Sequence, residues 1–454
     1  MPNAIDRTRL RDLTARELAR FEQDHPRSRE LSERAKANLL AGVPMPWMSE
    51  WAGSYPVFVA EAHGARFTDV DGREYVDLCL GDTGAMTGHA PKEAVEAIAE
   101  QAAKGITHML PTEDAALVGA EMQRRFGLPF WQFCLTATDA NRFTIRLARA
   151  ITARPKILVF NYCYHGSVDE TILTIADGVP GPRPGNVGAP VDPTQTTRVV
   201  EFNDVEALEE ALAYEDVACV LAEPALTNIG IVLPEPGYHD ALRRLTRDHG
   251  TYLVIDETHT ICAGPGGATR AWRLDPDFVT IGKPLASGVP AACYGMSAEI
   301  AERTETFMRG LPTTDVGGIG GTLSGNALSL AAMRATLEHV LTEEAFERMI
   351  ALGERWADGV KTSIDRHALP WEVQRIGCRA EYWFTPAPPR NGGQAAAVDD
   401  HELARFTHLY ALNRGILLTP FHNMALMSPA TTEADVDAHS VVFDEMAAEL
   451  ITQT

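Results

Sequence analysis

One short apolar run that ends in an acidic residue constrains the fold more than any other part of the chain. Residues 252–255 are uninterrupted apolar side chains, and Asp256 follows them directly. A strand of this composition is buried on both faces, as the central strands of a parallel sheet are. We therefore expect a parallel sheet with Asp256 at its carboxyl edge, where α/β proteins bind their ligands.

The segment from about residue 113 to residue 296 alternates helical patterns with short apolar runs, which predicts a mostly parallel sheet covered by helices. The expected strands are residues 132–135, 157–160, 218–222, 252–255 and 278–281, and the expected helices are 115–125, 140–152, 205–213 and 238–249. Between them, the Pro- and Gly-rich residues 178–193 are interpreted as a long surface loop.

The two ends of the chain show different patterns. Residues 1–40 favour one or two amphipathic helices, and residues 58–80 favour a small antiparallel sheet with a turn at Asp71-Gly72. The pattern after residue 326 predicts a smaller α/β domain. We expect three parts: residues 1–60 as N-terminal helices and a substrate-site loop belonging to the small domain, 61–325 as a large cofactor-binding domain, and 326–454 as the C-terminal small domain.

Charge and cysteine content limit the partners and the compartment. The chain has 40 basic and 62 acidic residues and a net charge of −22, which argues against nucleic acid or an anionic membrane as the main partner. Its apolar runs are shorter than the roughly 18 residues of a membrane span, and no signal-peptide core is visible. The seven scattered cysteines form no C-x-x-C pair, so neither a disulfide framework nor a metal site is indicated, and we expect a cytoplasmic protein.

Lys283 is the first candidate for covalent chemistry. It is one of only six lysines among the 40 basic residues, and it follows the apolar run 278–281. A desolvated lysine can lose its proton and form a Schiff base with a carbonyl, whereas an arginine stays charged. With Asp256 after the preceding strand, Lys283 suggests a pyridoxal phosphate site, in which the acid keeps the pyridine nitrogen protonated. A surface lysine and a helix-capping aspartate are the alternative interpretation.

Other polar and aromatic residues also follow predicted strands. Residues 136–141 open a helix with two threonine hydroxyls and free N–H groups, which suits a phosphate, although plain N-capping has the same pattern. Tyr164 is placed to stack on a planar cofactor or to pack in the core. Glu223 and Asn228 follow a third strand, and residues 320–326 offer a hydroxyl and N–H groups before another helix.

In order and spacing, these motifs resemble those of the class III (subgroup II) pyridoxal-phosphate-dependent aminotransferases, within the glutamate-1-semialdehyde aminomutase-like branch. The resemblance covers nearly the whole chain and rests on Arg27-Ser28, residues 69–72, Tyr164-His165-Gly166, Asp256-Glu257, Lys283, residues 321–326 and Met427-Ser428. It implies the fold-type I architecture: an α/β large domain with a mostly parallel, seven-stranded-type sheet, and a smaller α/β domain made from the N- and C-terminal segments. It also implies a homodimer with active sites at the subunit interface.

The resemblance assigns roles to single residues. Lys283 is implied to be the Schiff-base lysine and proton shuttle, and Asp256 the partner of the pyridine nitrogen. The remaining cofactor contacts are implied to be Ala137 and Thr138 at the phosphate, Tyr164 stacked on the ring, Glu223 and Asn228 near its phenolic side, Thr258 on its far face, and Thr322 at the phosphate of the neighbouring subunit. His165 and His259 lie near these motifs, but we interpret both as structural.

The positions that resemble substrate-binding residues depart from the family pattern. The substrate-binding arginine of the aminomutase aligns around Trp47 and Met48, and a family tryptophan aligns with Thr83. An apolar wall of this kind suits a hydrophobic group better than a carboxylate. Arg379 is either the source of the missing positive charge or an exposed surface arginine.

These observations favour an aminotransferase that moves an amino group between a small-molecule amine or amino acid and a 2-oxo acid acceptor. An aminomutase, racemase, lyase or decarboxylase of the same family is the alternative. A catalytically silent binding or assembly protein is the third possibility, but such a protein has no need for both Lys283 and Asp256.

Overall fold

The structure is a computed structural model that describes residues 5–312 and 317–451. The described residues form two compact units. Unit 1 contains the residues up to Pro91, Glu347–Pro388 and those from Val398 onward, and unit 2 contains those of Lys92–Phe346 and Pro389–Ala397. The functional division expected at residues 61 and 326 stays a prediction.

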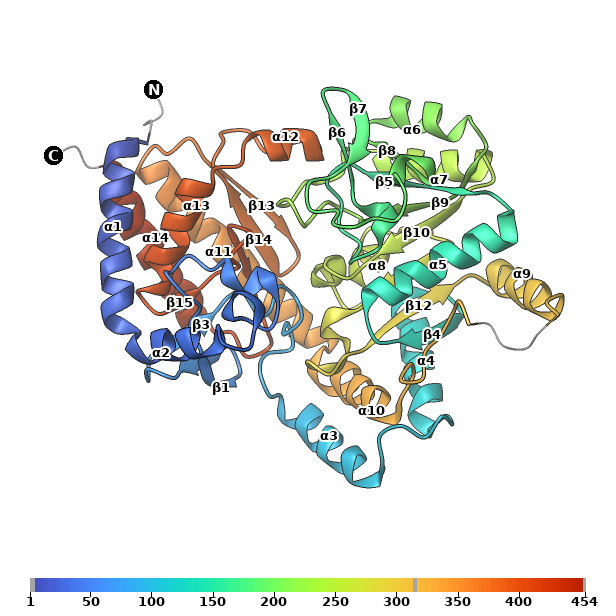
Figure 1. The fold of residues 1–454 in the computed structure, drawn as a ribbon, viewed down its shortest axis with the longest axis horizontal. Helices are drawn as coiled ribbons and strands as arrows, with labels where there is room; N and C mark the ends of the chain where they lie inside the picture. Colours follow the sequence, from blue (N-terminus) through green and yellow to red (C-terminus); the bar gives the residue numbers. More distant parts are fainter. Residues whose placement is uncertain (1–4, 313–316, 452–454) are drawn as a thin grey trace. The chain divides into compact units, whose positions relative to one another are not determined.

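Unit 2 is built on a seven-stranded sheet (Figure 1). Its strand order is β4 (Phe130–Cys134), β12 (Ala292–Met296), β11 (Phe278–Ile281), β10 (Tyr252–Asp256), β9 (Val217–Ala222), β5 (Lys156–Phe160) and β8 (Thr197–Val200). Strand β12 runs antiparallel to both of its neighbours, and the other pairs are parallel. The predicted α/β class with a mostly parallel sheet is confirmed.

The central strands are buried because helices cover the sheet. Every residue of β9 and β10 is buried. Helix α5 (Ala137–Thr152) packs across several strands, and α6 (Val205–Leu212) and α7 (Tyr238–Asp248) pack on each other, with α7 also against β10. Further helices of unit 2 are α3 (Lys92–Lys104), α4 (Glu113–Phe126), α8 (Gly267–Ala271), α9 (Ala298–Arg309), α10 (Ala327–Ala335) and α12 (Gly392–Ala397).

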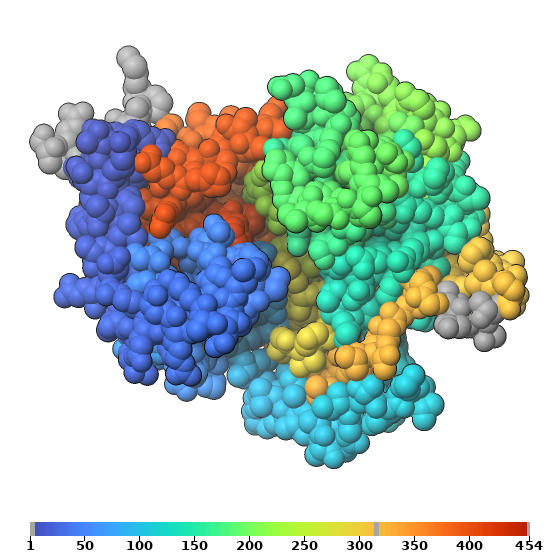
Figure 2. Space-filling model, viewed as in Figure 1, coloured from blue at the N-terminus to red at the C-terminus, as the bar shows by residue number. Residues whose placement is uncertain are grey.

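The loop predicted for residues 178–193 is partly wrong. Strand β7 (Val179–Pro182) pairs antiparallel with β6 (Leu173–Ala176). The two residues between these strands, Asp177 and Gly178, both have positive φ, which is the geometry of a tight hairpin turn. Residues 183–192 form no helix or strand, and Pro193 begins a 3₁₀ turn (Pro193–Gln195). Figure 2 shows the green part of the chain that contains the hairpin on the visible surface of unit 2.

Unit 1 combines two small sheets with long helices. The predicted antiparallel sheet is confirmed as β1 (Val59–His63), β2 (Arg66–Asp69) and β3 (Glu74–Asp77), extended by β15 (Ile416–Leu417), and Gly72 has a φ of +81° in the predicted turn. The second sheet is β13 (Glu372–Ile376), β14 (Arg379–Trp383) and β16 (Met424–Leu426).

The helices of unit 1 come from both the N-terminal and the C-terminal parts of the chain. The predicted N-terminal helices are α1 (Arg7–Asp24) and α2 (Pro26–Ala35). The later ones are α11 (Glu343–Arg366), whose first turn still belongs to unit 2, α13 (His401–Leu412) and α14 (Glu433–Ile451). Helix α1 packs beside α13, which packs beside α14 (Figure 1). Among the described helices, none has the length and apolar character needed to cross a membrane.

Candidate active site

The carboxyl ends of four neighbouring strands in unit 2 carry most of the residues predicted to bind a cofactor. Asp256 is the last residue of β10, and Lys283 lies two residues beyond β11. Glu223 follows β9 directly, and Tyr164 lies shortly after β5. Because the four strands are adjacent and parallel, these residues gather at one edge of the sheet, as expected for an α/β ligand site.

Three hydrogen bonds hold the carboxylate of Asp256. Its Oδ2 accepts from Nδ2 of Asn141 at 2.8 Å and pairs with Nδ1 of His165 at 2.9 Å, and its Oδ1 accepts from the backbone N–H of Thr258 at 3.1 Å. Burial by itself raises the pKa of Asp256, but the bonds and charge of His165 and the other donors hold this pKa below its usual value. The carboxyl group is therefore ionised at neutral pH despite its burial.

His165 provides the positive charge that faces Asp256. Burial favours its neutral form, but the neighbouring Cys163 and the carboxylate of Asp256 outweigh this effect and raise the pKa of His165 from 6.5 to about 10. Sequence reasoning missed this role and that of Asn141. Asn141 lies one helical turn after Ala137 in α5, on the same face of the helix. The helix expected from the sequence begins at residue 140 and does not include Ala137.

The raised pKa of His165 makes a prediction about stability and pH. A histidine whose folded-state pKa is raised stabilises the fold fully below its unfolded pKa of 6.5, and loses this effect as pH rises through about 10. The free energy of unfolding of wild type minus that of His165→Gln is therefore expected to decrease over this range. Urea denaturation of the full chain at a series of pH values measures it, with the exposed His401→Gln as control. A difference that stays constant with pH contradicts the charged pair.

The loops that follow β4, β5 and β11 meet at the first turn of α5. Thr136 caps this helix, since its Oγ1 accepts from the N–H of Asp139 at 3.1 Å, and Ala137 and Thr138 are the first helical residues. The loop after β5 reaches Thr138, whose Oγ1 accepts from the N–H of Ser167 at 3.1 Å. The loop after β11 brings Gly282 so close that a Cβ there would lie 3.1 Å from the nitrogen of Ala137. The result is a backbone cradle at a helix N-terminus, which favours an anion.

Position 166 requires a glycine because the loop after β5 passes close to Thr138 at the start of α5. A Cβ at this position would lie 2.1 Å from Oγ1 of Thr138, and its φ is +77°. Gly178 has the same φ with no atom within 4 Å, so Gly178→Ala tests the backbone strain by itself. We expect Gly166→Ala to lower the free energy of unfolding by about 1–3 kcal/mol more than Gly178→Ala, and to weaken cofactor retention. Denaturation and cofactor absorbance after gel filtration measure the two effects; equal losses in both variants contradict the cradle.

Glu223 fixes the backbone around the predicted stacking tyrosine. Its Oε1 accepts from the N–H of Tyr164 at 3.2 Å, and its Oε2 accepts from the N–H of Thr227 at 3.1 Å and from the Thr227 hydroxyl. Burial raises the pKa of Glu223. Asn228 follows in the same turn and is half-buried, and the side chain of Tyr164 is exposed.

Lys283 opens a 3₁₀ turn (Lys283–Ala286) with a φ of +54°. Its Nζ lies 2.8 Å from Nε2 of His259. Sequence reasoning kept His259 outside the catalytic set, yet the structure places its imidazole against the candidate reactive amine. Thr258, the neighbour of His259, is buried.

The remaining predicted residues lie elsewhere. Thr322 lies in the exposed segment before α10, where it lines a pocket with Met109 and Leu110. The four substrate candidates belong to unit 1: Trp47 and Met48 in a 3₁₀ turn (Pro46–Ser49), Thr83 in a buried turn with a φ of +81°, and Arg379 at the start of β14. Their roles stay predictions.

Arg379 is not the exposed surface arginine of the alternative interpretation. Its side chain is fully buried, with its guanidinium 3.7 Å from the carboxylate of Asp82 and 3.8 Å from that of Glu381. The alternative is wrong because β14 is the central strand of its three-stranded sheet, and every residue of β14 is buried.

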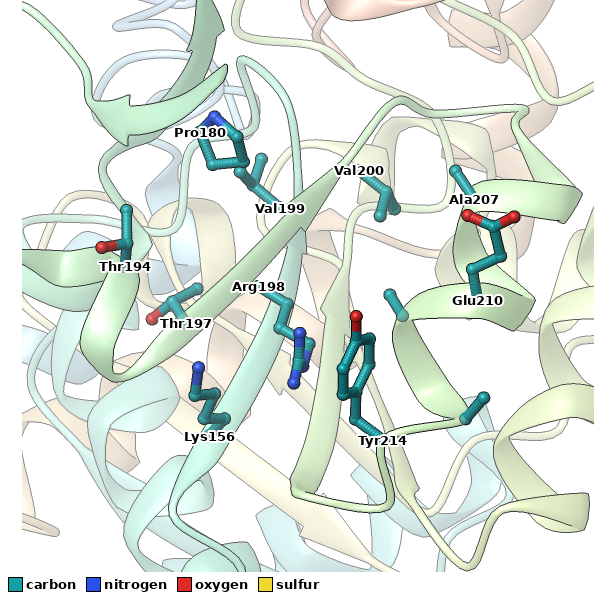
Figure 3. Close-up of a pocket in the computed structure, with 12 residues that line it drawn as sticks. Lys156, Pro180, Thr194, Thr197, Arg198, Val199, Val200, Ala207, Glu210 and Tyr214 are labelled. Carbon is teal, nitrogen blue, oxygen red and sulfur yellow. The ribbon is translucent and has the colours of Figure 1, made fainter. Parts of the chain in front are cut away.

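A pocket of about 690 Å³ beside the edge strand β8 contains none of the predicted site residues (Figure 3). Its Lys156 is the first residue of β5, at the opposite end of that strand from Tyr164. The guanidinium of Arg198 lies 3.8 Å from the centre of the Tyr214 ring and pairs with Asp216 at 2.7 Å. This pocket therefore lies at the amino end of β5, away from the carboxyl edge of the sheet that carries the candidate site residues.

The residues at the carboxyl edge fit pyridoxal phosphate. A buried ionised carboxylate suits a protonated pyridine nitrogen, a lysine at the next strand end suits an aldehyde, and the cradle at α5 suits a phosphate. The fold and the site together define a fold-type I pyridoxal phosphate enzyme.

Comparisons with known proteins give the family. The profile of the family described as "Aminotransferase class-III" matches residues 47–444, and the chain belongs to this family. It is 33% identical over 418 residues to a glutamate-1-semialdehyde 2,1-aminomutase of Desulfitobacterium hafniense, covering 90% of this chain and 95% of that protein.

Solved structures agree. A glutamate-1-semialdehyde-aminomutase from Pseudomonas aeruginosa PAO1 is 49% identical with a TM-score of 0.96, covering 98% of this chain and 99% of that one. A lysine-to-alanine variant of that protein has been solved in complex with PMP. An omega-transaminase from Sphaerobacter thermophilus is 27% identical with a TM-score of 0.85, covering 93% and 97% of the two chains. The cofactor of the present chain is pyridoxal phosphate.

Proposed function

We propose that this enzyme moves an amino group in small amine or amino-acid substrates, with Lys283 as the residue that carries the cofactor. The observation that carries the proposal is the placement of Lys283 and Asp256 at the ends of adjacent parallel strands, with Asp256 held ionised by Asn141 and His165. When bound, pyridoxal phosphate supplies an electron sink for bonds to the carbon that bears the amino group.

Individual side chains are proposed to transfer protons and to bind the cofactor. Nζ of Lys283 is proposed to remove and return the proton at the substrate carbon, and Asp256 to hold the proton on the pyridine nitrogen. Binding and orientation of the cofactor are assigned to Ala137, Thr138, Tyr164, Glu223, Asn228, Thr258 and, from a neighbouring subunit, Thr322. The hydrogen bonds of Asn141 and His165 keep the Asp256 carboxylate in one orientation and one charge state.

Within the family, we propose first that the amino group moves between two carbons of one substrate, as in an aminomutase. The support is that relatives named as aminomutases match nearly the full chain at 33% and 49% identity. This order differs from the expectation drawn from the sequence, which favoured a transaminase with a 2-oxo acid acceptor.

Transamination is the second candidate, and a specific observation favours it. Trp47, Met48 and Thr83 stand where the resemblance expects the substrate contacts of an aminomutase. An exposed Trp47 whose ring lies 6.4 Å from that of Phe421 presents an apolar surface, which suits a hydrophobic amine or amino acid. Arg379 remains the proposed source of positive charge for a carboxylate.

One experiment separates the two reactions. The purified enzyme is incubated with a panel of α-amino acids, β-amino acids, aromatic amines and glutamate 1-semialdehyde, with and without a 2-oxo acid, and the products are identified by mass spectrometry. An aminomutase gives a rearranged product without the acceptor. A transaminase gives a carbonyl product that accumulates only with the acceptor. No product from any substrate, with or without acceptor, would favour a silent binding protein.

We also propose a cytoplasmic homodimer with shared active sites. Met109 and Leu110 are 80% and 74% exposed and line the same pocket as Thr322, next to Leu323, which is 50% exposed. Apolar groups exposed together in this way mark an interaction surface. Analytical ultracentrifugation of wild type and Met109→Asp tests the proposal: wild type should sediment as a dimer and the variant should dissociate.

A further inference from the structure

We propose that His259 is a second catalytic residue, which exchanges a proton with Nζ of Lys283; this inference rests on the proposed role of Lys283. The two nitrogen atoms are 2.8 Å apart. A hydrogen bond of this length needs one donor and one acceptor, and an ammonium group has no lone pair to accept with. An ammonium on Lys283 therefore faces a neutral Nε2 of His259 that is ready to take its proton.

The backbone places the two side chains at matched positions. Strands β10 and β11 are parallel with Asp256 opposite Thr280, and His259 and Lys283 each lie the same number of residues beyond that pair. The N–H of Glu257 donates to the carbonyl of Thr280 at 2.8 Å, which ties the two strand ends together. The register of β10 and β11 therefore brings the side chains of His259 and Lys283 together.

Backbone hydrogen bonds hold the turn that carries His259 in place. The N–H of Ile261 donates to the carbonyl of Glu257 at 2.9 Å, and the N–H of Cys262 donates to the carbonyl of His259 at 3.3 Å. On the other side, Lys283 is followed by the buried Pro284. The two turns therefore hold the imidazole of His259 beside the amine of Lys283.

The proposed exchange is direct. His259 is only 5% exposed, and the short contact between the two nitrogen atoms lets a proton pass without an intervening water molecule. In the proposed step the Nζ–H bond of the Lys283 ammonium breaks and an Nε2–H bond forms on His259. The lysine becomes a neutral amine, the imidazole becomes an imidazolium, and no electrons leave the pair. Only the neutral amine attacks a carbonyl, so His259 prepares Lys283 to capture the cofactor.

The test measures cofactor capture, which requires no substrate turnover. Full-length protein freed of cofactor by treatment with an amine and dialysis is mixed with pyridoxal phosphate, and the absorbance change is followed. Borohydride then fixes the cofactor, and peptide mapping locates it. We expect His259→Gln to capture about 10²-fold more slowly than wild type, and added imidazole to restore part of the rate in His259→Ala. Gln keeps a hydrogen bond to Nζ but cannot carry the proton.

The matched control is His239→Gln. His239 is a half-buried histidine of the same unit whose Nε2 contacts the carbonyl of Pro224 at 2.8 Å, so its ring bonds only to backbone there. This variant is expected to capture at the wild-type rate. If circular dichroism shows that His259→Gln is unfolded, His259→Asn takes its place. A wild-type capture rate in the folded His259 variant, with label on Lys283, overturns the role of His259 only. Label on another residue of wild type overturns the proposed function itself.

Discussion

Replacing Lys283 by arginine is expected to reduce turnover of every amine substrate by about 10⁴-fold. The guanidinium keeps the positive charge but cannot lose a proton, so it can neither bond to the cofactor aldehyde nor carry the substrate proton. Single-turnover absorbance changes of the bound cofactor measure the loss. Borohydride should no longer fix the cofactor to the protein.

Lys156→Arg is the matched control for this substitution. Lys156 begins β5 and lines the pocket of Figure 3, away from the carboxyl edge of the sheet. Its variant should keep wild-type turnover and wild-type labelling. Turnover that survives in Lys283→Arg at the wild-type level would mean that another amine performs the chemistry.

Replacing Asp256 by asparagine is expected to reduce both stability and turnover. The variant leaves the buried, protonated His165 without its carboxylate, and breaking a buried ion pair in this way costs about 3–5 kcal/mol. The pyridine nitrogen loses its anionic partner as well, so the electron sink weakens and turnover falls by roughly 10³-fold. Denaturant unfolding and steady-state kinetics measure the two effects separately.

The double variant Asp256→Asn, His165→Gln separates the ion pair from general disruption. With the positive charge also removed, the cost of the first substitution should shrink, so the two losses of unfolding free energy should sum to more than the loss of the double variant. If the two losses of unfolding free energy add up to the loss of the double variant, the interaction between Asp256 and His165 does not contribute to stability. Turnover should remain low in the double variant, because the carboxylate is still missing.

The sequence predicts the central strands of unit 2 well, because strands that are buried on both faces appear in the sequence as uninterrupted apolar runs. The runs at residues 157–160, 218–222, 252–255 and 278–281 lie within β5, β9, β10 and β11. Strand β12 was not predicted, since a glycine interrupts it. A Cβ at Gly295 would lie 2.6 Å from the ring of Trp131, so this strand uses a glycine to accommodate the neighbouring tryptophan.

The sequence indicates a candidate site residue most clearly where the residue's type is itself unusual. Lys283 and Asp256 stand out as a rare lysine and a carboxylate after an apolar run. Asn141, His165 and His259 have no such signal, because their roles depend on contacts with residues distant in the chain. Spacing along a helix places Asn141 near Ala137 but does not reveal its partner Asp256. The register between β10 and β11 explains only the contact of His259 with Lys283.

The division of residues between the two units has a practical consequence for engineering. Asn141, His165 and His259, which bond to Asp256 and Lys283, belong to unit 2. Trp47, Met48, Thr83 and Arg379 belong to unit 1. A mutant library confined to these four positions changes residues of unit 1 alone. Variants from such a library that retain the cofactor absorbance but accept new amines would show that this fold can acquire substrates independently of its chemistry.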